Sequence, residues 1–440
     1  MKRFNLWSYM TIVLGKLSFS ATIYFGVFVH LIMFGVVFHY LTPENYMPLS
    51  GDTYYSTSME GAAALAKTFI ASGQLAFEPN GVPVGFRMPM HYFLMGITSA
   101  WNVKYWWLLW AIASSCLFGL ILVCITRIGC RFEIPHSALN LLLLIYILHP
   151  AVLSQMRNMG WWLSGTLFSL LVVLSILRYF EKPCMARTCT LGLVLGLGCL
   201  VHGSFLLLPI AVALVVIFGS SGKISLRFFH SVIVFFVAVL VLSPWTIRNY
   251  HAFGKFIPSS TGAGLQFWGA QNEYFSVDGL GKTTFALADK IIQQRMNKSL
   301  PLVQAGILDM EVDRELSESA KQLLLSEPTL FFRRFYIGFF SFWAPKLTSL
   351  PKLLIAMIIN YPFVILMLVL FSAAIANRTL TRPIFSCASV LFYFWMLFAA
   401  VQAIASYYVT QLPLLFLLVG GLAVAQHKFL ESIPAKTSSD

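Results

Sequence analysis

The chain alternates between long apolar runs and shorter polar stretches. Most of the apolar runs approach the ~20 residues that a helix needs to cross a ~30 Å hydrocarbon core. Two shorter runs follow one another and are joined by the turn at residues 202–204. We therefore predict an all-α polytopic membrane protein with about ten transmembrane helices. The predicted spans cover residues 18–41, 105–126, 137–155, 162–180, 188–202, 204–219, 228–245, 353–376, 384–403 and 407–426.

The composition supports this class. Hydrophobic residues make up 58% of the chain and charged residues 11%, whereas about a quarter of the residues in ordinary soluble domains are charged. The formal charge of +13 therefore bears on lipid surfaces and topology rather than on nucleic acid. The first apolar run is too long for a signal peptide and has no small-residue cleavage site. An integral membrane protein with membrane lipids as partners is expected.

The distribution of cations predicts the orientation. With the N-terminus inside, fourteen of the thirty Lys and Arg residues lie in cytoplasmic segments or at cytoplasmic span edges, and four lie in short outer segments. The remaining twelve fall in one long outer loop, where the positive-inside rule carries little weight. We expect a multi-pass protein of the plasma membrane (the inner membrane of a bacterium) with both termini cytoplasmic.

Two outer segments carry most of the polar residues and divide the chain into three regions. Residues 1–245 form a transmembrane region with a first outer loop at 42–104, residues 246–350 form a long outer loop, and residues 351–440 form a C-terminal transmembrane region with a cytoplasmic tail. Pro244 is expected to end the seventh span because proline lacks the backbone N–H of a helix interior. The pattern predicts amphipathic or interfacial helices at 59–72, 309–327 and 329–343, and a semi-apolar piece from Met88 onward.

The positions of the acidic residues and cysteines argue against an ion-coupled transporter, a disulfide framework and a metal site. All seventeen Asp and Glu residues fall outside the apolar spans, whereas an ion-coupled transporter generally needs ionisable groups at membrane depth. The one ionisable residue near the middle of a span that could serve such a transporter is His30. A lone histidine at that place is more often a packing residue. No cysteine lies in an outer loop, so no disulfide framework is expected, and no Cys/His spacing suggests a metal site.

Three stretches of the chain carry recognisable motifs. The first is an acid after the first span with a following helix and a Pro/Tyr segment, the second is a Gly-rich span, and the third is a PWTIRNY run followed by FGKFIP. The chain is similar in these places to the GT-C-fold enzymes that use polyprenyl-phosphate sugars. That superfamily includes glycosyltransferase family 39, the aminoarabinose transferases of lipid A and the protein O-mannosyltransferases. In the first stretch the matching residues are Asp52, Tyr55, 62–66, Gly73 and 87–92. The second stretch covers residues 192–209, and the third covers residues 244–250 and 253–258.

The resemblance implies a GT-C-like bundle with juxtamembrane helices on its outer face and an inverting glycosyltransferase activity there. The enzyme would move a sugar from a polyprenyl-phosphate donor to a glycan, lipid or protein acceptor in the periplasm or at the exterior. Asp52 would be the general base that takes the proton of the acceptor hydroxyl, a role worth roughly 10²–10⁴-fold in rate. Cations of the protein would stabilise the leaving phosphate, so a divalent metal is compatible with the reaction but not required.

Each candidate residue also has a structural interpretation. Asp52 alone is as well explained as a helix N-cap or a solvated loop acid, and Glu60 as an ion-pair partner. A single interfacial cation is more often a lipid contact, and interfacial aromatics occur without a ligand. The phosphate candidates are Arg87, Arg248, Lys67 and Arg157; the substrate candidates are Tyr54, Tyr55, Glu60, His91, Tyr92, His202, Asn249 and Tyr250.

The chain departs from the family pattern in three places. Trp162 to Gly165 stand where many relatives have a Ser-Glu pair, Val201-His202 where they often have Thr-Arg, and Ser406-Tyr407 where they often have Arg-Tyr. Two alternatives therefore stay open: a non-catalytic membrane scaffold, and a lipid-glycan transporter in the assembly of cell-envelope glycans. The sequence does not specify the sugar, the acceptor or the isoprenoid.

Overall fold

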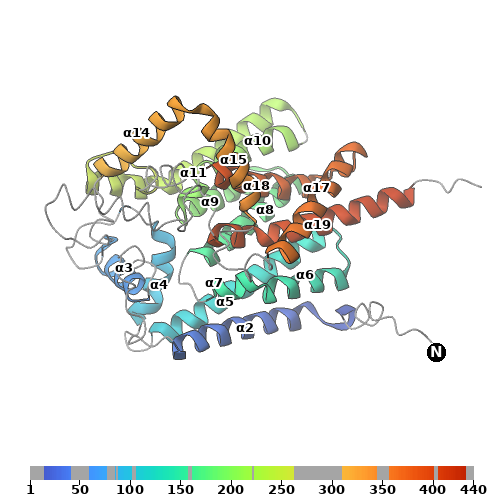
Figure 1. Ribbon diagram of the computed structural model, residues 1–440, viewed down its shortest axis with the longest axis horizontal. Coiled ribbons are helices and arrows are strands. Elements are labelled where there is room, and N and C mark those ends of the chain that lie inside the picture. Colours follow the sequence, from blue (N-terminus) through green and yellow to red (C-terminus); the bar gives the residue numbers. More distant parts are fainter. Residues whose placement is uncertain are drawn as a thin grey trace, which may run out of the picture.

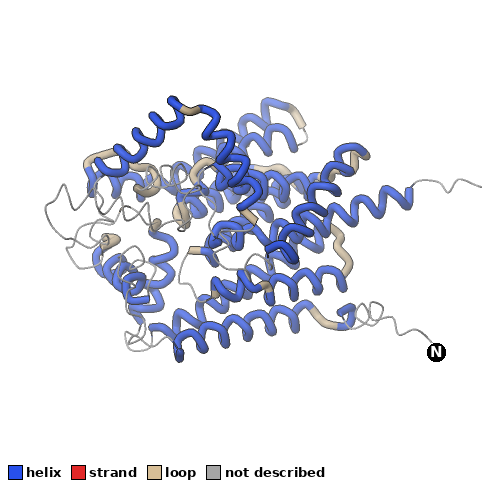
Figure 2. Tube along the Cα trace, viewed as in Figure 1, coloured by secondary structure: helices blue, strands red, loops and turns tan. Residues whose placement is uncertain are grey.

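The computed structural model describes most of the chain, and every regular element in that part is a helix or a helical turn (Figures 1 and 2). The predicted all-α class is therefore confirmed. The described residues are 14–40, 59–76, 85, 88–101, 106–156, 161–220, 222–261, 310–343, 356–400 and 405–432.

Every predicted span contains an apolar helix. In the described residues, six helices are long and apolar enough to cross a membrane, and shorter apolar helices occupy the other four spans. This pattern is that of a polytopic membrane protein. The helices of the spans are α2 (Phe19–Tyr40), α5 (Trp106–Arg131), α6 (His136–Leu148), α7 (Pro150–Gln155), α8 (Trp162–Glu181), α9 (Met185–Cys199), α10 (Leu208–Gly219), α11 (Ile224–Phe253), α17 (Tyr361–Ala376), α18 (Arg382–Ala400) and α19 (Ala405–Ser432).

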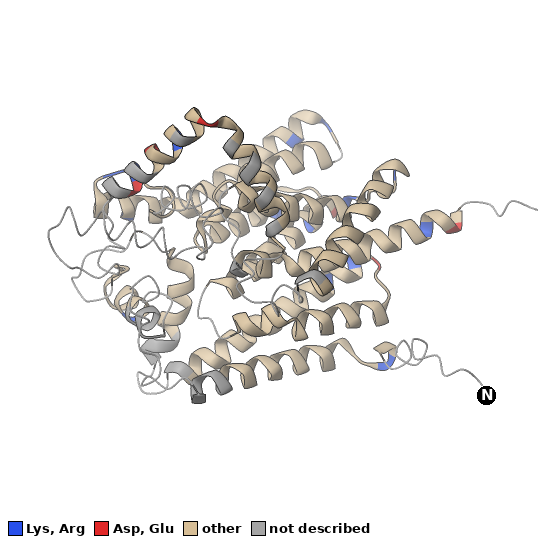
Figure 3. Ribbon diagram, in the orientation of Figure 1, with Lys and Arg blue, Asp and Glu red and all other residues tan. Residues whose placement is uncertain are grey.

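Helix α8 lies at the centre of the bundle. It packs against α5, α9, α18 and α19. Of the residues in its apolar stretch, 83% are buried inside the protein, whereas only 22% are buried in the apolar stretches of α11 and α17. The large side chains that α11 exposes are apolar, as expected of a lipid-facing helix. The ribbon positions of charged residues lie near the helix ends and along α14, and in the described part the middles of the bundle helices carry none (Figure 3).

Two glycines of the Gly-rich stretch allow α9 to lie directly on α11. A Cβ atom at Gly192 would come within 2.8 Å of the carbonyl oxygen of Val234, and one at Gly196 within 2.8 Å of that of Ala238. Small residues at a four-residue spacing permit this close approach of membrane helices. The second resembling stretch thus has a packing explanation in this chain.

Pro244 does not end the helix of the seventh span, and the prediction that the helix stops there is wrong. Helix α11 continues through Pro244 for nine more residues, to Phe253. The proline nitrogen leaves the carbonyl oxygen of Leu240 without its usual helical donor, but the Ser243 hydroxyl donates to that oxygen at 2.8 Å. A side chain that takes over a freed backbone group is what lets a membrane helix contain proline.

The predicted span at 137–155 consists of two helices, α6 and α7, which meet at His149 and Pro150. His149 Nδ1 accepts the N–H of Ala151 at 3.2 Å, so Nε2 carries the hydrogen and donates to Asn360 Oδ1 at 2.9 Å. Asn360 Nδ2 in turn donates to the carbonyl of Trp343 at 2.7 Å. These hydrogen bonds give the backbone at the break a side-chain partner, and they connect the break to the π-helical turn η5 (Ala356–Asn360).

The two segments predicted as outer loops form helices where the pattern predicts them. Helices α3 (Met59–Ser72) and α4 (Pro89–Trp101) follow the first span, and α14 (Met310–Ser326) and α15 (Pro328–Ser341) precede α17. In Figure 1, α14 lies along the outside of the bundle and α15 descends onto α18. The Trp395 indole donates to the carbonyl of Phe339 at 2.8 Å, which fastens α15 to α18. The opposite face of α15 exposes aromatic rings, as expected of an interfacial helix.

The hydroxyl of Ser243 should be needed only because Pro244 is present. We expect Ser243→Ala to lower the free energy of unfolding by about 0.5–1.5 kcal/mol, because the Leu240 carbonyl loses its donor. In a Pro244→Ala background, which restores the backbone donor, the same change should be close to neutral. Thermal unfolding of the four proteins in one detergent measures this coupling; equal effects of Ser243→Ala in both backgrounds would contradict it.

Candidate functional site

The candidate site lies at the end of the bundle where α9 and α11 end and where α8 and α19 begin. Helices α3 and α4 dock on this end, at the left of Figure 1. The N–H of Met90 donates to the carbonyl of Leu200 at 3.0 Å, and the Phe69 ring meets the Trp245 ring edge-on at 6.4 Å. The first outer loop and the third resembling stretch are therefore neighbours in space.

Helix α11 is longer than a hydrocarbon core. Its 30 residues correspond to ~45 Å at 1.5 Å per residue, against ~30 Å for the core of a bilayer. A helix of this length that crossed without tilt would extend about two to three turns beyond the hydrocarbon region, counted over both ends. The helix ends at Gly254, whose φ of 66° lies in the left-handed region that favours glycine, and whose N–H donates to Tyr250 at 2.8 Å.

After Gly254 the chain turns back, and side chains of α11 hold the returning segment. The Trp245 indole donates to the carbonyl of Ser259 at 2.7 Å, and the Thr246 hydroxyl to that of Pro258 at 3.0 Å. Asn249 is fully buried, and its Nδ2 donates to the carbonyls of Ile257 and Ser259 at 3.1 and 3.0 Å. The polar side chains of the third resembling stretch thus bind their own chain.

Arg248 has a different environment. Its Nη1 donates to Asn249 Oδ1 at 3.1 Å, and its guanidinium carbon lies 4.7 Å from the centre of the Trp245 ring and 5.7 Å from that of Phe253. Its Nη2 is buried and has no hydrogen-bond partner among the described residues. A guanidinium with one neutral amide partner and one remaining buried donor is well suited to bind an anion.

The segment that precedes α4 also meets the end of α11. The N–H of Thr261 donates to the carbonyl of Gly85 at 2.8 Å. A Cβ atom at Gly85 would lie 2.9 Å from the Phe253 ring, the same ring that flanks Arg248. Gly85 therefore brings the first outer loop into contact with the elements that position Arg248.

His202 lies in the turn between α9 and the short helix η2 (Gly203–Phe205) and is clamped between aromatic rings. Its imidazole stacks on Trp161 at 3.9 Å and meets Tyr407 at 5.6 Å. The N–H of Ser204 donates to His202 Nδ1 at 3.2 Å, which leaves the ring hydrogen on Nε2. A Cβ atom at Gly203 would be 3.4 Å from Ser260 Oγ, so this turn touches the segment that Asn249 holds.

The other predicted site residues are placed as follows. Asp52, Tyr54, Tyr55, Arg87 and Arg157 lie outside the described residues, and Glu60 belongs to α3 but its side chain is not described. His91 and Tyr92 are 2% and 6% exposed, and His91 packs against Trp110, whereas Tyr250 is 56% exposed. Lys67 is partly buried on α3. The structure thus brings Arg248, Asn249 and His202 to one end of the bundle.

Two aromatic residues at this end were not among the predicted site residues. Trp161 and Tyr407 flank His202, and Tyr407 stacks on Phe398 at 4.1 Å, which continues the aromatic surface toward α15. In the sequence both are aromatics at the start of a span, the place where an interfacial belt supplies them in any case. Only their contact with His202 distinguishes Trp161 and Tyr407 from ordinary aromatic residues of an interfacial belt.

The histidines and cysteines elsewhere in the described residues have structural explanations. His30 Nδ1 lies 3.0 Å from Ser115 Oγ, and His230 Nδ1 lies 2.9 Å from the Tyr179 hydroxyl. All seven cysteines are free thiols. Within the described ranges no three His, Cys, Asp or Glu side chains come together as metal ligands.

Comparisons with known proteins leave the family open. No family model matches the chain, and no curated protein matches it in sequence. Among solved structures, the apo form of the oligosaccharyltransferase of Archaeoglobus fulgidus is similar, with 12% identity and a TM-score of 0.49. The match covers 92% of this chain and 50% of that one, so this chain spans about half the length of the archaeal protein. Likeness at this level assigns no activity.

Asn249 should be the strongest determinant of stability at this end of the bundle. Asn249→Ala removes the donors to two buried carbonyls and the acceptor of Arg248, so we expect a loss of about 2–4 kcal/mol in the free energy of unfolding. Tyr250→Ala, on the exposed neighbouring position, should change it by less than about 0.5 kcal/mol. Denaturant unfolding in mixed micelles measures both. A small effect of Asn249→Ala would show that the returning segment is held by other contacts.

Proposed function

We propose that the protein is an inverting glycosyltransferase that uses a polyprenyl-phosphate sugar donor at the end of the bundle formed by α9, α11, α3 and α4. The observation that carries the proposal is Arg248, a partly buried guanidinium whose Nη2 has no partner among the described residues. It lies near the end of the 30-residue helix α11, within the stretch that resembles GT-C enzymes. A lipid phosphate held at the membrane surface would reach this depth.

Arg248 would bind the phosphate of the donor. Its ring contacts with Trp245 and Phe253 and its bond to Asn249 fix the plane of the guanidinium. A planar guanidinium presents parallel N–H donors that match the oxygens of a phosphate. Because the return segment is bonded to Asn249 and Trp245, the position of the cation is set before a ligand arrives, which lowers the cost of binding.

Asp52 is the proposed general base. The acceptor hydroxyl oxygen attacks the anomeric carbon, its proton passes to the Asp52 carboxylate, and the bond between that carbon and the phosphate oxygen breaks. The configuration at the anomeric carbon inverts, and the polyprenyl phosphate leaves with the bonding electrons. Charge that develops on the leaving phosphate is stabilised by Arg248, with Arg87, Lys67 and Arg157 as further candidate cations.

The remaining candidates are proposed to contact the sugar or the acceptor. The aromatic group of Trp161, His202 and Tyr407 offers ring faces to a sugar. Tyr250 is exposed beside Arg248. Tyr54, Tyr55, Glu60, His91 and Tyr92 complete the proposed substrate residues, and the acceptor class (glycan, lipid or protein) follows from the resemblance. The proposed site faces the periplasm or the exterior, and both chain ends face the cytoplasm.

The proposed base is tested by Asp52→Asn, which keeps the shape of the side chain but removes its basicity. We expect the rate of sugar transfer to fall by about 10²–10⁴-fold, since a positioned base contributes that much. Glu78→Gln, in the same predicted loop, is the matched control and should keep the rate within about twofold. Purified protein is incubated with labelled polyprenyl-phosphate sugars and donor consumption is followed. Unchanged transfer by Asp52→Asn removes Asp52 from the mechanism.

The phosphate contact is tested separately by binding. Arg248→Gln should weaken binding of the polyprenyl-phosphate donor by about tenfold to a hundredfold, because it removes a charge-assisted contact worth roughly 1.5–3 kcal/mol. Arg248→Lys should recover part of this affinity, and Lys255→Gln, an exposed cation just beyond α11, should leave it unchanged. Equilibrium binding of labelled donor to protein in nanodiscs measures the affinities. A wild-type protein that neither binds nor consumes the donor would instead support the non-catalytic scaffold.

A further inference from the structure

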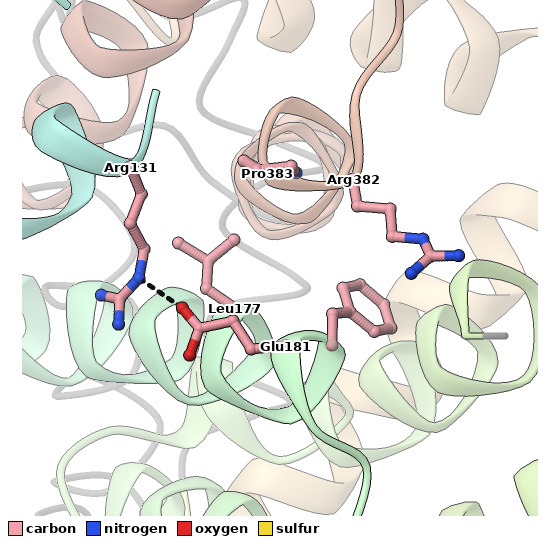
Figure 4. A pocket seen from close by; sticks show the side chains of 6 residues that line it. Arg131, Leu177, Glu181, Arg382 and Pro383 are labelled. Atoms are coloured by element: carbon pink, nitrogen blue, oxygen red, sulfur yellow. Dashed lines mark hydrogen bonds and ion pairs between the residues drawn. The ribbon is translucent and has the colours of Figure 1, made fainter. Parts of the chain in front are cut away.

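A cavity lies at the opposite end of the bundle from the candidate site, where α5 and α8 end and α18 begins (Figure 4). Its volume is about 240 Å³, and its lining is Arg131, Leu177, Phe180, Glu181, Arg382 and Pro383. Sites for drug-sized molecules usually measure ~300–1,000 Å³. The cavity is therefore smaller than a usual drug-sized site and has room for a small anionic group.

The charges around this cavity are unbalanced. Arg131 Nε donates to Glu181 Oε1 at 2.8 Å, and Arg187 Nη1 lies 3.5 Å from Glu181 Oε2, so one carboxylate already faces two guanidinium groups. The exposed side chain of Arg382 makes no hydrogen bond or ion pair with another described residue. The cavity itself is lined by two guanidinium groups and one carboxylate, an excess of one positive charge, and Arg187 adds a further cation beside Glu181, which favours an anion.

The geometry suits a phosphate group with an apolar attachment. In Figure 4, Arg131 and Arg382 lie on opposite sides, with Leu177 between them. Phe180 and Leu177 are 7% and 4% exposed and supply an apolar floor. Helix α18 begins at Arg382, so its unpaired backbone N–H groups add positive potential at the same place. Since the helices that end here are apolar and of membrane-crossing length, the cavity lies at the level of lipid head groups.

We propose that this cavity binds a phosphate group, that of an anionic phospholipid or of a soluble phosphate ester, between Arg131 and Arg382. Glu181 limits the affinity because its carboxylate competes for Arg131 and Arg187. The site is independent of the proposed glycosyltransferase reaction, which takes place at the other end of α5, α8 and α18. Its occupancy ties together the ends of three helices that are far apart in the sequence.

The test is a lipid titration of the purified full-length protein followed by native mass spectrometry. Phosphatidylglycerol, which is anionic, and phosphatidylcholine, whose head group is zwitterionic, are compared at ~0.15 M salt, where exposed charges beyond ~8 Å are screened. We expect saturable binding of one phosphatidylglycerol. Arg382→Gln should weaken it about tenfold, Glu181→Gln should strengthen it severalfold, and Lys16→Gln, an exposed cation outside the cavity, should change it less than twofold.

The opposite effects of Arg382→Gln and Glu181→Gln separate a binding role from a structural one, because damage to the fold would weaken binding in both variants. Competition by inorganic phosphate or glycerol phosphate identifies the source of the ligand. Displacement at low millimolar concentration supports a soluble phosphate ester, and no displacement supports the phospholipid. Equal losses in Arg382→Gln and Lys16→Gln, or the lack of saturable binding by any of these probes, would overturn the proposal.

Discussion

The constraint on which this structure depends is that backbone groups at membrane depth must find hydrogen-bond partners within the protein. Two departures from regular helix show how the chain meets it. At Pro244 the hydroxyl of Ser243 donates to the freed carbonyl of Leu240, and α11 continues. At the break between α6 and α7, His149 accepts the N–H of Ala151 and passes a hydrogen bond on to Asn360. Because the Ser243 hydrogen bond compensates for Pro244, α11 continues to Phe253 and includes Arg248.

The same rule explains the end of α11. Once the chain turns back at Gly254, its backbone would have several buried groups without partners, and Trp245, Thr246 and Asn249 supply them. Three of the polar side chains in the PWTIRNY run are therefore engaged with their own chain. Arg248 differs because its guanidinium has a neutral amide partner and two ring contacts, and a buried donor remains. Within this run, Arg248 is the residue type most suited to an anion, and its buried Nη2 has no partner among the described residues.

Much of the fold could be predicted from the pattern of apolar and polar residues, because the length needed to cross a bilayer is a strong constraint. Helices α3 and α14 also follow from amphipathic spacing. The predicted end at Pro244 was wrong, since a single hydroxyl one residue earlier compensates for the proline and no spacing rule reveals such a bond. The site was less predictable. Arg248 was found through its resembling stretch, but Trp161 and Tyr407 matter only through their three-dimensional contact with His202.

The two ends of the bundle differ in whether their Lys and Arg side chains have acidic partners. At the end of α5 and α8, Arg131 and Arg187 share the carboxylate of Glu181, and Lys428 pairs with Glu133. These pairs are exposed, so each contributes little to stability. At the other end, Arg248 has no acidic partner among the described residues, although removing a guanidinium from water without a counter-ion costs free energy. An anionic ligand would supply the missing charge beside Arg248, and this is the physical reason why the proposed function assigns the donor phosphate to this position.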